Sequence, residues 1–154
     1  METQPLVESA LIDILVVESN PAEARLIAEG FLDAGHMRKI EQLHSGEDAL
    51  SYLLREPPYQ ESALPDLILL DLSLPRKSGF ELLEEIRASD SLKRIPVIIL
   101  SGSADPIDVR RAYELHANCY LRKPNELDEL LSMIKTCYRF WGRTVRLPPR
   151  AKPS

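Results

Sequence analysis

The strict alternation of five short apolar segments with five amphipathic ones restricts the fold of this chain more than any other feature. The apolar segments are residues 12–17, 38–43, 66–71, 95–100 and 118–123. Three of them are nearly continuous in Val, Ile and Leu, as strands covered on both faces are, whereas the second alternates like a strand near a sheet edge. This order predicts an α/β fold with a parallel sheet and right-handed crossovers.

Each amphipathic segment begins with a residue suited to cap a helix. In every case Asp or Glu follows three residues later, which is the spacing of a capping box. Two of these segments also carry proline at the first helical position. The predicted caps are Asn20, Ser45, Ser78, Asp105 and Asn125.

A five-stranded sheet in the order 2-1-3-4-5, with helices on both faces, fits this pattern as a flavodoxin-like three-layer fold. Such sheets bind ligands outside the carboxyl ends of their strands, at the point between the first and third strands where the order reverses. At 154 residues, the chain is long enough for one such domain. We expect an N-terminal tail at 1–9, the domain at 10–141 and a basic C-terminal arm at 142–154.

Polar residues stand at the expected ends of four strands: Glu18 and Ser19, Asp71, Ser101 and Gly102, and Lys123. The two carboxylates can share a hard divalent cation, and Mg²⁺ suits them because it prefers oxygen ligands. With its charge neutralised, Asp71 could attack a phosphoryl group as a nucleophile. The other phosphoryl oxygens could then be held by the Ser101 hydroxyl, the Gly102 N–H and Lys123.

Composition and other motifs argue against several classes of protein. The formal net charge of −5 disfavours non-specific nucleic-acid binding. Cys119 and Cys137 have no CxxC spacing and are interpreted as reduced packing residues of a cytoplasmic protein. We expect no signal peptide and no membrane helix, which needs about 18 apolar residues. The segment ESNPAE after the first strand is not the G-x-G-x-x-G of a dinucleotide site.

Several separated segments resemble the receiver domains of two-component response regulators. DLILLDLSLPRKSGFELLEEIR at 66–87 is similar to the phosphoacceptor block of this family. IPVIILSGS at 95–103 resembles its fourth strand, and CYLRKP at 119–124 resembles its fifth. The resemblance covers residues 10–138. The matching residues are Asp71, Pro75, Gly79, Ser101, Tyr120, Lys123 and Pro124, the last at a position that is usually a cis proline in the family.

The resemblance implies a single-domain response regulator that works as a two-state switch. A partner histidine kinase would transfer a phosphoryl group to Asp71, to be bound by Ser101, Gly102 and Lys123. Ser101 would move toward this group and Tyr120 would rotate into the vacated space. Such a protein is not an enzyme, since it assists only its own phosphorylation and dephosphorylation.

The first strand departs from the family at the metal site. Receivers usually end this strand with two adjacent acids; Glu18 matches the first, but Ser19 replaces the second. The resemblance therefore implies Mg²⁺ held by Glu18, Asp71 and the Ser73 backbone carbonyl, and held weakly because Ser19 offers only a neutral hydroxyl. The alternative is a degenerate receiver that acts as a phosphorylation-independent interaction module.

The C-terminal residues predict how the signal leaves the domain. We expect Gly142 to stop the last helix ahead of an extended arm. Residues 139–154 carry five basic residues and no acid, which leaves −10 on the remainder of the chain. The arm and the loop at 55–65 resemble the small response regulators that accompany bacterial phytochromes. This implies a phytochrome as a candidate kinase, output through protein contacts and a homodimer through Met133, Cys137, Phe140, Trp141, Val145 and Leu147.

Overall fold

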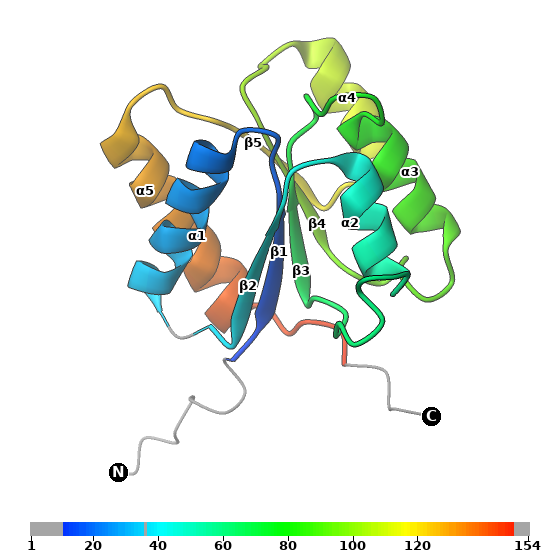
Figure 1. Cartoon of the computed structure of the whole chain (residues 1–154). Coiled ribbons are helices and arrows are strands. Elements are labelled where there is room, and N and C mark those ends of the chain that lie inside the picture. Colours follow the sequence, from blue (N-terminus) through cyan, green and yellow to red (C-terminus); the bar gives the residue numbers. More distant parts are fainter. Residues whose placement is uncertain (1–10, 36, 150–154) are drawn as a thin grey trace.

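The apolar segments of the sequence form a parallel five-stranded sheet in the computed structural model, which describes residues 11–35 and 37–149 (Figure 1). The strand order is β2-β1-β3-β4-β5, as predicted. Every residue of the three central strands is buried, whereas β2 and β5 lie at the edges and are partly exposed. The strands are β1 (Asp13–Val17), β2 (Lys39–Leu43), β3 (Leu67–Leu70), β4 (Val97–Ser101) and β5 (Cys119–Arg122).

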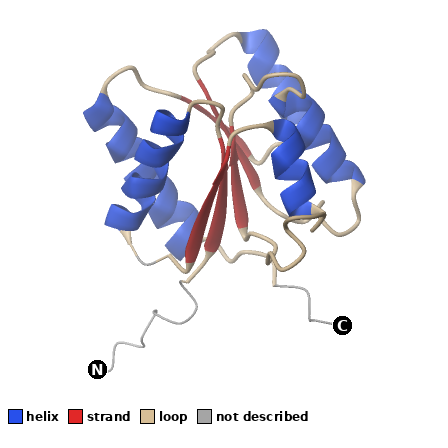
Figure 2. Ribbon diagram, in the orientation of Figure 1, coloured by secondary structure: helices blue, strands red, loops and turns tan. Residues whose placement is uncertain are grey.

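Helices cover both faces of the sheet, which gives the expected three layers (Figure 2). The helices are α1 (Pro21–Ala34), α2 (Gly46–Leu53), α3 (Gly79–Ala88), α4 (Pro106–Glu114) and α5 (Leu127–Cys137). In Figure 1, α1 and α5 lie on one face, and α2, α3 and α4 lie on the other. Alternate side chains of each strand fill the two cores, with Ile14 and Val16 in one and Leu15 and Val17 in the other.

Four of the five predicted helix caps are confirmed. The side chains of these residues accept hydrogen bonds from backbone N–H groups in the first turn of their helices. The prediction for Asn125 is wrong, because α5 begins at Leu127 after Glu126, and Glu126 makes no side-chain cap hydrogen bond. The confirmed caps are Asn20, Ser45, Ser78 and Asp105.

The prediction that Gly142 stops the last helix is also wrong. The chain continues from α5 through a π-helical segment, η1 (Tyr138–Thr144), and the Val145 N–H closes it on the Phe140 carbonyl at 2.7 Å. Gly142 is needed for close packing, since a Cβ there would lie 2.9 Å from the Tyr138 ring. Val145, which follows this segment, has an extended backbone, and residues 146–149 have no regular secondary structure.

The tail at 1–9 and the end of the arm at 150–154 lie outside the described residues. Within the described ranges, no helix combines the length and apolarity needed to cross a membrane.

Candidate functional site

The two predicted acids meet at the carboxyl edge of the sheet, between β1 and β3. The register pairs Val17 with Leu70, so Glu18 and Asp71 follow side by side. The Asp71 N–H donates to the Val17 carbonyl at 3.0 Å and fixes this alignment. Glu18 is 2% exposed and Asp71 is 7% exposed, so both carboxyl groups are largely withdrawn from water. This is the point of strand reversal at which open α/β sheets bind ligands.

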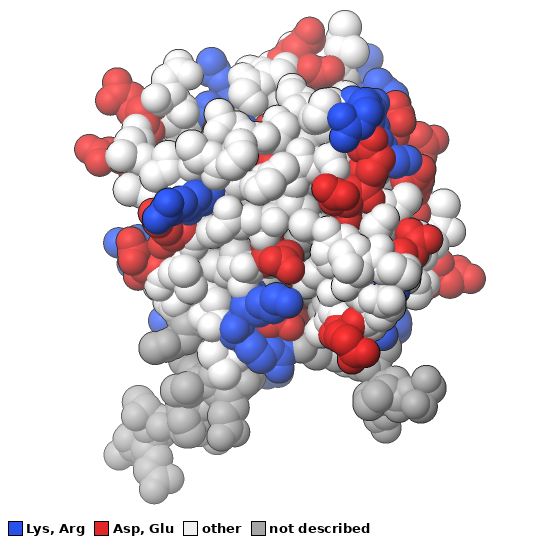
Figure 3. Space-filling model, in the orientation of Figure 1, with Lys and Arg blue, Asp and Glu red and all other residues white. Residues whose placement is uncertain are grey.

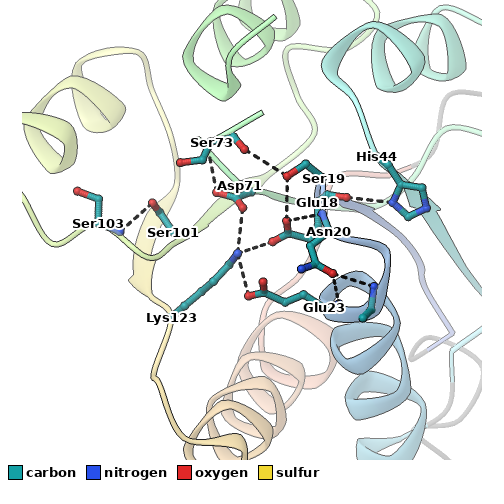
Figure 4. A network of polar contacts seen from close by, with 11 residues as sticks. Glu18, Ser19, Asn20, Glu23, His44, Asp71, Ser73, Ser101, Ser103 and Lys123 are labelled. Atoms are coloured by element: carbon teal, nitrogen blue, oxygen red, sulfur yellow. Dashed lines mark hydrogen bonds and ion pairs between the residues drawn. The ribbon is translucent and has the colours of Figure 1, made fainter. Parts of the chain in front are cut away.

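Lys123, which follows β5, joins three carboxylates in the same pocket (Figure 4). Its Nζ atom contacts Glu18 Oε1, lies 2.9 Å from Asp71 Oδ2 and lies 2.9 Å from Glu23 Oε1. The sequence pattern places Glu23 only at a helix start, three residues after the Asn20 cap, and does not indicate its contact with Lys123. No local signal marks this contact, because Glu23 lies in the first turn of α1 whereas Lys123 follows β5.

The pocket holds an excess of negative charge. Burial works against the charge of Lys123, but the hydrogen bonds that it donates to Glu18, Asp71 and Glu23 outweigh burial and raise its pKa. Burial and the neighbouring Asp71 carboxylate raise the pKa of Glu18, despite the opposing effects of Lys123 and of the Asn20 N–H. Two buried acids that share one ammonium are therefore ready to accept a further cation.

The oxygen atoms around Asp71 suit Mg²⁺. Asp71 Oδ1 accepts a hydrogen bond from the Ser73 N–H at 3.0 Å, and Ser19 Oγ lies 3.4 Å from the Ser73 carbonyl oxygen and 3.5 Å from Glu18 Oε2. The described residues contain no group of three His, Cys, Asp or Glu side chains placed to hold a metal. Mg²⁺ nevertheless fits this donor set, because it takes hard oxygen ligands and keeps several waters. Glu18, Asp71, the Ser73 carbonyl and the Ser19 hydroxyl are the residues that would hold it.

Backbone packing and a histidine hold the two acidic strand ends in place. His44 Nδ1 donates to the Glu18 carbonyl at 3.0 Å, which requires the tautomer with a proton on Nδ1. Gly79, the first residue of α3, lies against the backbone of Asp71, where a Cβ would come within 2.4 Å of the Asp71 carbonyl oxygen. The resemblance placed glycine here, and the close approach explains why.

The two predicted switch residues, Ser101 and Tyr120, both contact Ser103. The buried Ser101 hydroxyl accepts a hydrogen bond from the Ser103 N–H at 3.2 Å, and the Tyr120 hydroxyl donates to the Ser103 carbonyl at 2.8 Å. Ser103 Oγ donates to Asp108 at 2.7 Å and accepts from the Asp105 N–H at 3.2 Å. Ser103 therefore links β4, β5 and the start of α4.

Gly102 and Pro124 complete the predicted strand ends. Gly102 is exposed, and a Cβ there would meet no atom within 4 Å, so this side of the pocket is open. The expected cis bond before Pro124 is absent: in the described ranges the cis peptide bond is Pro57–Pro58, and Lys123–Pro124 is trans.

The residues of the predicted dimer face lie in two separate places, a hollow beside α5 and the C-terminal arm. Met133, Cys137, Phe140 and Trp141 line an apolar hollow of about 460 Å³ between β5 and α5. Phe140 is 52% exposed at its rim, whereas Cys137 belongs to the core, and burial raises the pKa of its thiol to about 12.

Val145 and Leu147 do not line this hollow. Leu147 packs against the core of its own domain, and the following prolines, Pro148 and Pro149, line a pocket of about 230 Å³ with Pro65 and Pro96. The arm therefore folds back along the domain, because its apolar residues find partners there.

Comparisons with known proteins match this arrangement. The family model for the response regulator receiver domain matches residues 14–135. Response regulator Rcp1 of Synechocystis sp. is 42% identical over 135 residues, which are 88% of this chain and 92% of Rcp1. The crystal structure of the phosphorylated cyanobacterial phytochrome response regulator RcpA has a TM-score of 0.87 at 40% identity, over 90% of this chain and 99% of that one. The Mn²⁺-bound form of Rcp1 has a TM-score of 0.84 at 42% identity, with the same shares covered.

Proposed function

Since this chain belongs to the response regulator receiver domain family, we propose that it is a phosphorylatable response regulator whose Asp71 accepts a phosphoryl group from a histidine kinase. One observation carries the proposal: Asp71, Glu18 and Lys123 converge, buried, at the point where the strand order reverses. Buried charged groups gathered at the ligand-binding end of an open α/β sheet are a mark of functional sites, and here they are the groups that phosphoryl transfer to an aspartate would use.

The contacts of Asp71 orient it for attack. The Ser73 N–H holds Oδ1 and the Lys123 ammonium holds Oδ2, so the carboxylate plane is fixed before the donor arrives. A bond forms between a carboxylate oxygen and phosphorus, and the bond between phosphorus and the kinase histidine nitrogen breaks. A divalent cation in the pocket supplies charge neutralisation when bound. Lys123 stays beside Asp71 and stabilises the oxygens of the transferred group.

Phosphorylation would act on the rest of the domain through Ser101. The phosphoryl group adds about −1.5 to −2 charges and three acceptor oxygens. The Ser101 hydroxyl, which now accepts from the Ser103 N–H, would turn to donate to one of these oxygens. Ser103 would then lose one of its contacts, and the Tyr120 hydroxyl that it holds would be freed to move. The charge change thereby biases a bistable packing of α4 and β5.

The proposed output and partners follow from the proposed switch and from the comparisons. On the face shown in Figure 3, Lys and Arg side chains lie among Asp and Glu side chains. The similarity to phytochrome response regulators supports a bacterial phytochrome as the kinase. This function places the protein in the cytoplasm, in keeping with its two free cysteines. It turns over no substrate beyond its own phosphoryl group.

The hollow between β5 and α5 supports a homodimer. Its lining is mostly apolar, and Phe140 lies exposed at its rim, edge-on to Trp141 with ring centroids 5.4 Å apart. A second copy of this surface would cover Phe140, Trp141 and Met133 together. The arm contributes less than the sequence predicted, because Leu147 is already packed against its own domain.

Intact mass after incubation with a small acyl phosphate and Mg²⁺ tests the proposal. One phosphoryl adduct, absent from Asp71→Asn, is the expected result. Ser19 supports the alternative of a degenerate receiver, and the Ser19→Asp variant decides between them. If the natural chain stays unmodified and only Ser19→Asp gains an adduct, the protein is a phosphorylation-independent interaction module.

A further inference from the structure

We infer that Glu23 supplies the negative charge that Ser19 leaves out of the metal site, and so sets the affinity of the pocket for divalent cations. The inference rests on the proposed function, because it concerns the cation that assists phosphorylation of Asp71. It concerns a side chain that enters the pocket from α1, whereas the family pattern places its acids at the strand ends.

Glu23 forms the outer wall of the acidic pocket. It lies in the first turn of α1, and its Oε1 atom is 2.9 Å from the same Lys123 ammonium that contacts Glu18 and Asp71 (Figure 4). The Glu23 side chain is 32% exposed, against 3% for that of Glu18 and 8% for that of Asp71. Glu23 is therefore the most exposed of the three acids that contact Lys123.

The charges explain what this outer acid contributes. A receiver with two adjacent acids and an acceptor aspartate sets three carboxylates against one lysine. Here Ser19 reduces the strand-end acids to Glu18 and Asp71, and Glu23 restores the third carboxylate. The pocket then carries a formal charge of −2, which a divalent cation neutralises. Without Glu23, the formal charge would be −1.

Glu23 need not bind the cation directly to have this effect. Coulomb interactions fall off only with the first power of distance, and a partly buried pocket screens them less than bulk water does. Glu23 also engages Lys123, so that the ammonium does not neutralise Glu18 and Asp71 alone. It is a positioning and charge-balancing residue rather than a ligand, in keeping with the lack of a three-acid metal cluster among the described residues.

A purely structural role for Glu23 makes different predictions. An acid in the first turn stabilises a helix through the helix dipole, and the Glu23 N–H donates to the Asn20 cap at 3.2 Å. That role would change the stability of α1, which urea unfolding of Glu23→Gln measures, and would leave Mn²⁺ binding by the folded protein unchanged. Mn²⁺ binding that weakens in Glu23→Gln and recovers with Ser19→Asp therefore separates charge balance from helix stability.

The experiment measures Mn²⁺ binding to the full-length, unphosphorylated protein, from the electron paramagnetic resonance signal of free Mn²⁺. We expect Glu23→Gln to weaken binding on the order of tenfold at low salt, and by less at high salt, because a unit charge near a divalent ion is screened. The double variant Ser19→Asp/Glu23→Gln should bind at least as tightly as the natural chain. Glu29→Gln is the matched control, because Glu29 lies on the same helix and pairs with Arg25.

Two results would overturn the inference while the proposed function stands. The first is an affinity of Glu23→Gln for Mn²⁺ that stays within about twofold of that of the natural chain, while Asp71→Asn abolishes Mn²⁺ binding. The other is weakened binding that Ser19→Asp does not restore. A natural chain that binds no Mn²⁺ would instead count against the metal-dependent function itself, and the inference would fall with it.

Discussion

At the scale of single residues, the site concentrates charge where charge is costly. Glu18 and Asp71 are buried at the ends of apolar strands, and Lys123 provides one positive charge for both. Buried ion pairs recover their desolvation cost only when geometry and hydrogen bonding are good. The buried charges of the metal-free site therefore lower the free energy of unfolding, and a bound cation would reduce this effect.

The raised pKa of Glu18 predicts how this cost depends on pH. The folded protein binds the Glu18 proton more tightly than the unfolded chain, whose pKa is near 4.5. The contribution of Glu18 to the free energy of unfolding of the metal-free protein should therefore fall as pH rises. The fall should begin near the unfolded-state pKa of 4.5 and end above the raised pKa of the folded protein. Glu18→Gln should become more stable relative to the natural chain over this range.

Urea unfolding with a chelator, at steps from about pH 4 to about pH 7, measures this difference. Glu29→Gln, the same change at an exposed glutamate outside the pocket, serves as the control. A Glu18→Gln variant that loses relative stability as pH rises would mean that Lys123 controls Glu18 more strongly than burial and Asp71 do.

The strand-end residues could be predicted from the sequence because apolar runs define where strands end. In a parallel sheet the carboxyl ends share one edge, so Glu18, Asp71 and Lys123 had to meet there. Glu23 could not be placed in the same way. Its contact with Lys123 depends on where the first turn of α1 lies relative to the end of β5, which no local pattern of the sequence expresses.

At the scale of elements, Ser103 connects Ser101, at the candidate site, to α4. All its polar groups are engaged: the N–H with Ser101, the carbonyl with Tyr120, and the hydroxyl with Asp105 and Asp108. A movement of Ser101 would therefore disturb Ser103 and, through it, the first turn of α4.

Ser103→Ala tests this connection, because it removes the two hydroxyl contacts and keeps the backbone ones. The amides of the first turn of α4 should exchange with deuterium faster in the unphosphorylated variant, and phosphorylation should change their exchange less. Ser132→Ala, at an exposed serine of α5, is the control. Unchanged exchange in α4 would show that Ser103 does not transmit the switch.

Local patterns predicted the helices well, except where packing overrides local preference. Asn20, Ser45, Ser78 and Asp105 cap their helices, since a side chain that bonds the first turn is a local effect. The errors at Asn125 and Gly142 both concern α5 and its extension, where contacts with the domain decide the geometry. The Tyr138 ring, which lies against Gly35 at the end of α1, makes one such contact.

At the scale of the whole molecule, the hollow between β5 and α5 predicts self-association. Phe140→Asp would place a charge at an apolar interface, so we expect it to shift a dimer to monomers in sedimentation velocity. Leu32→Asp is the matched control, because Leu32 is an exposed leucine of α1. A natural chain that remains monomeric at micromolar concentration would contradict the dimer and leave the phosphoryl site untouched.

The measurement that tests the central claim most directly is the location of the phosphoryl group on the chain. After treatment with an acyl phosphate and Mg²⁺, borohydride reduction converts a phosphorylated aspartate to homoserine, and peptide mass spectrometry identifies the residue. The account predicts homoserine at position 71 and at no other aspartate. Modification elsewhere, or none at saturating Mg²⁺, would contradict the assignment of Asp71 as the phosphoryl acceptor.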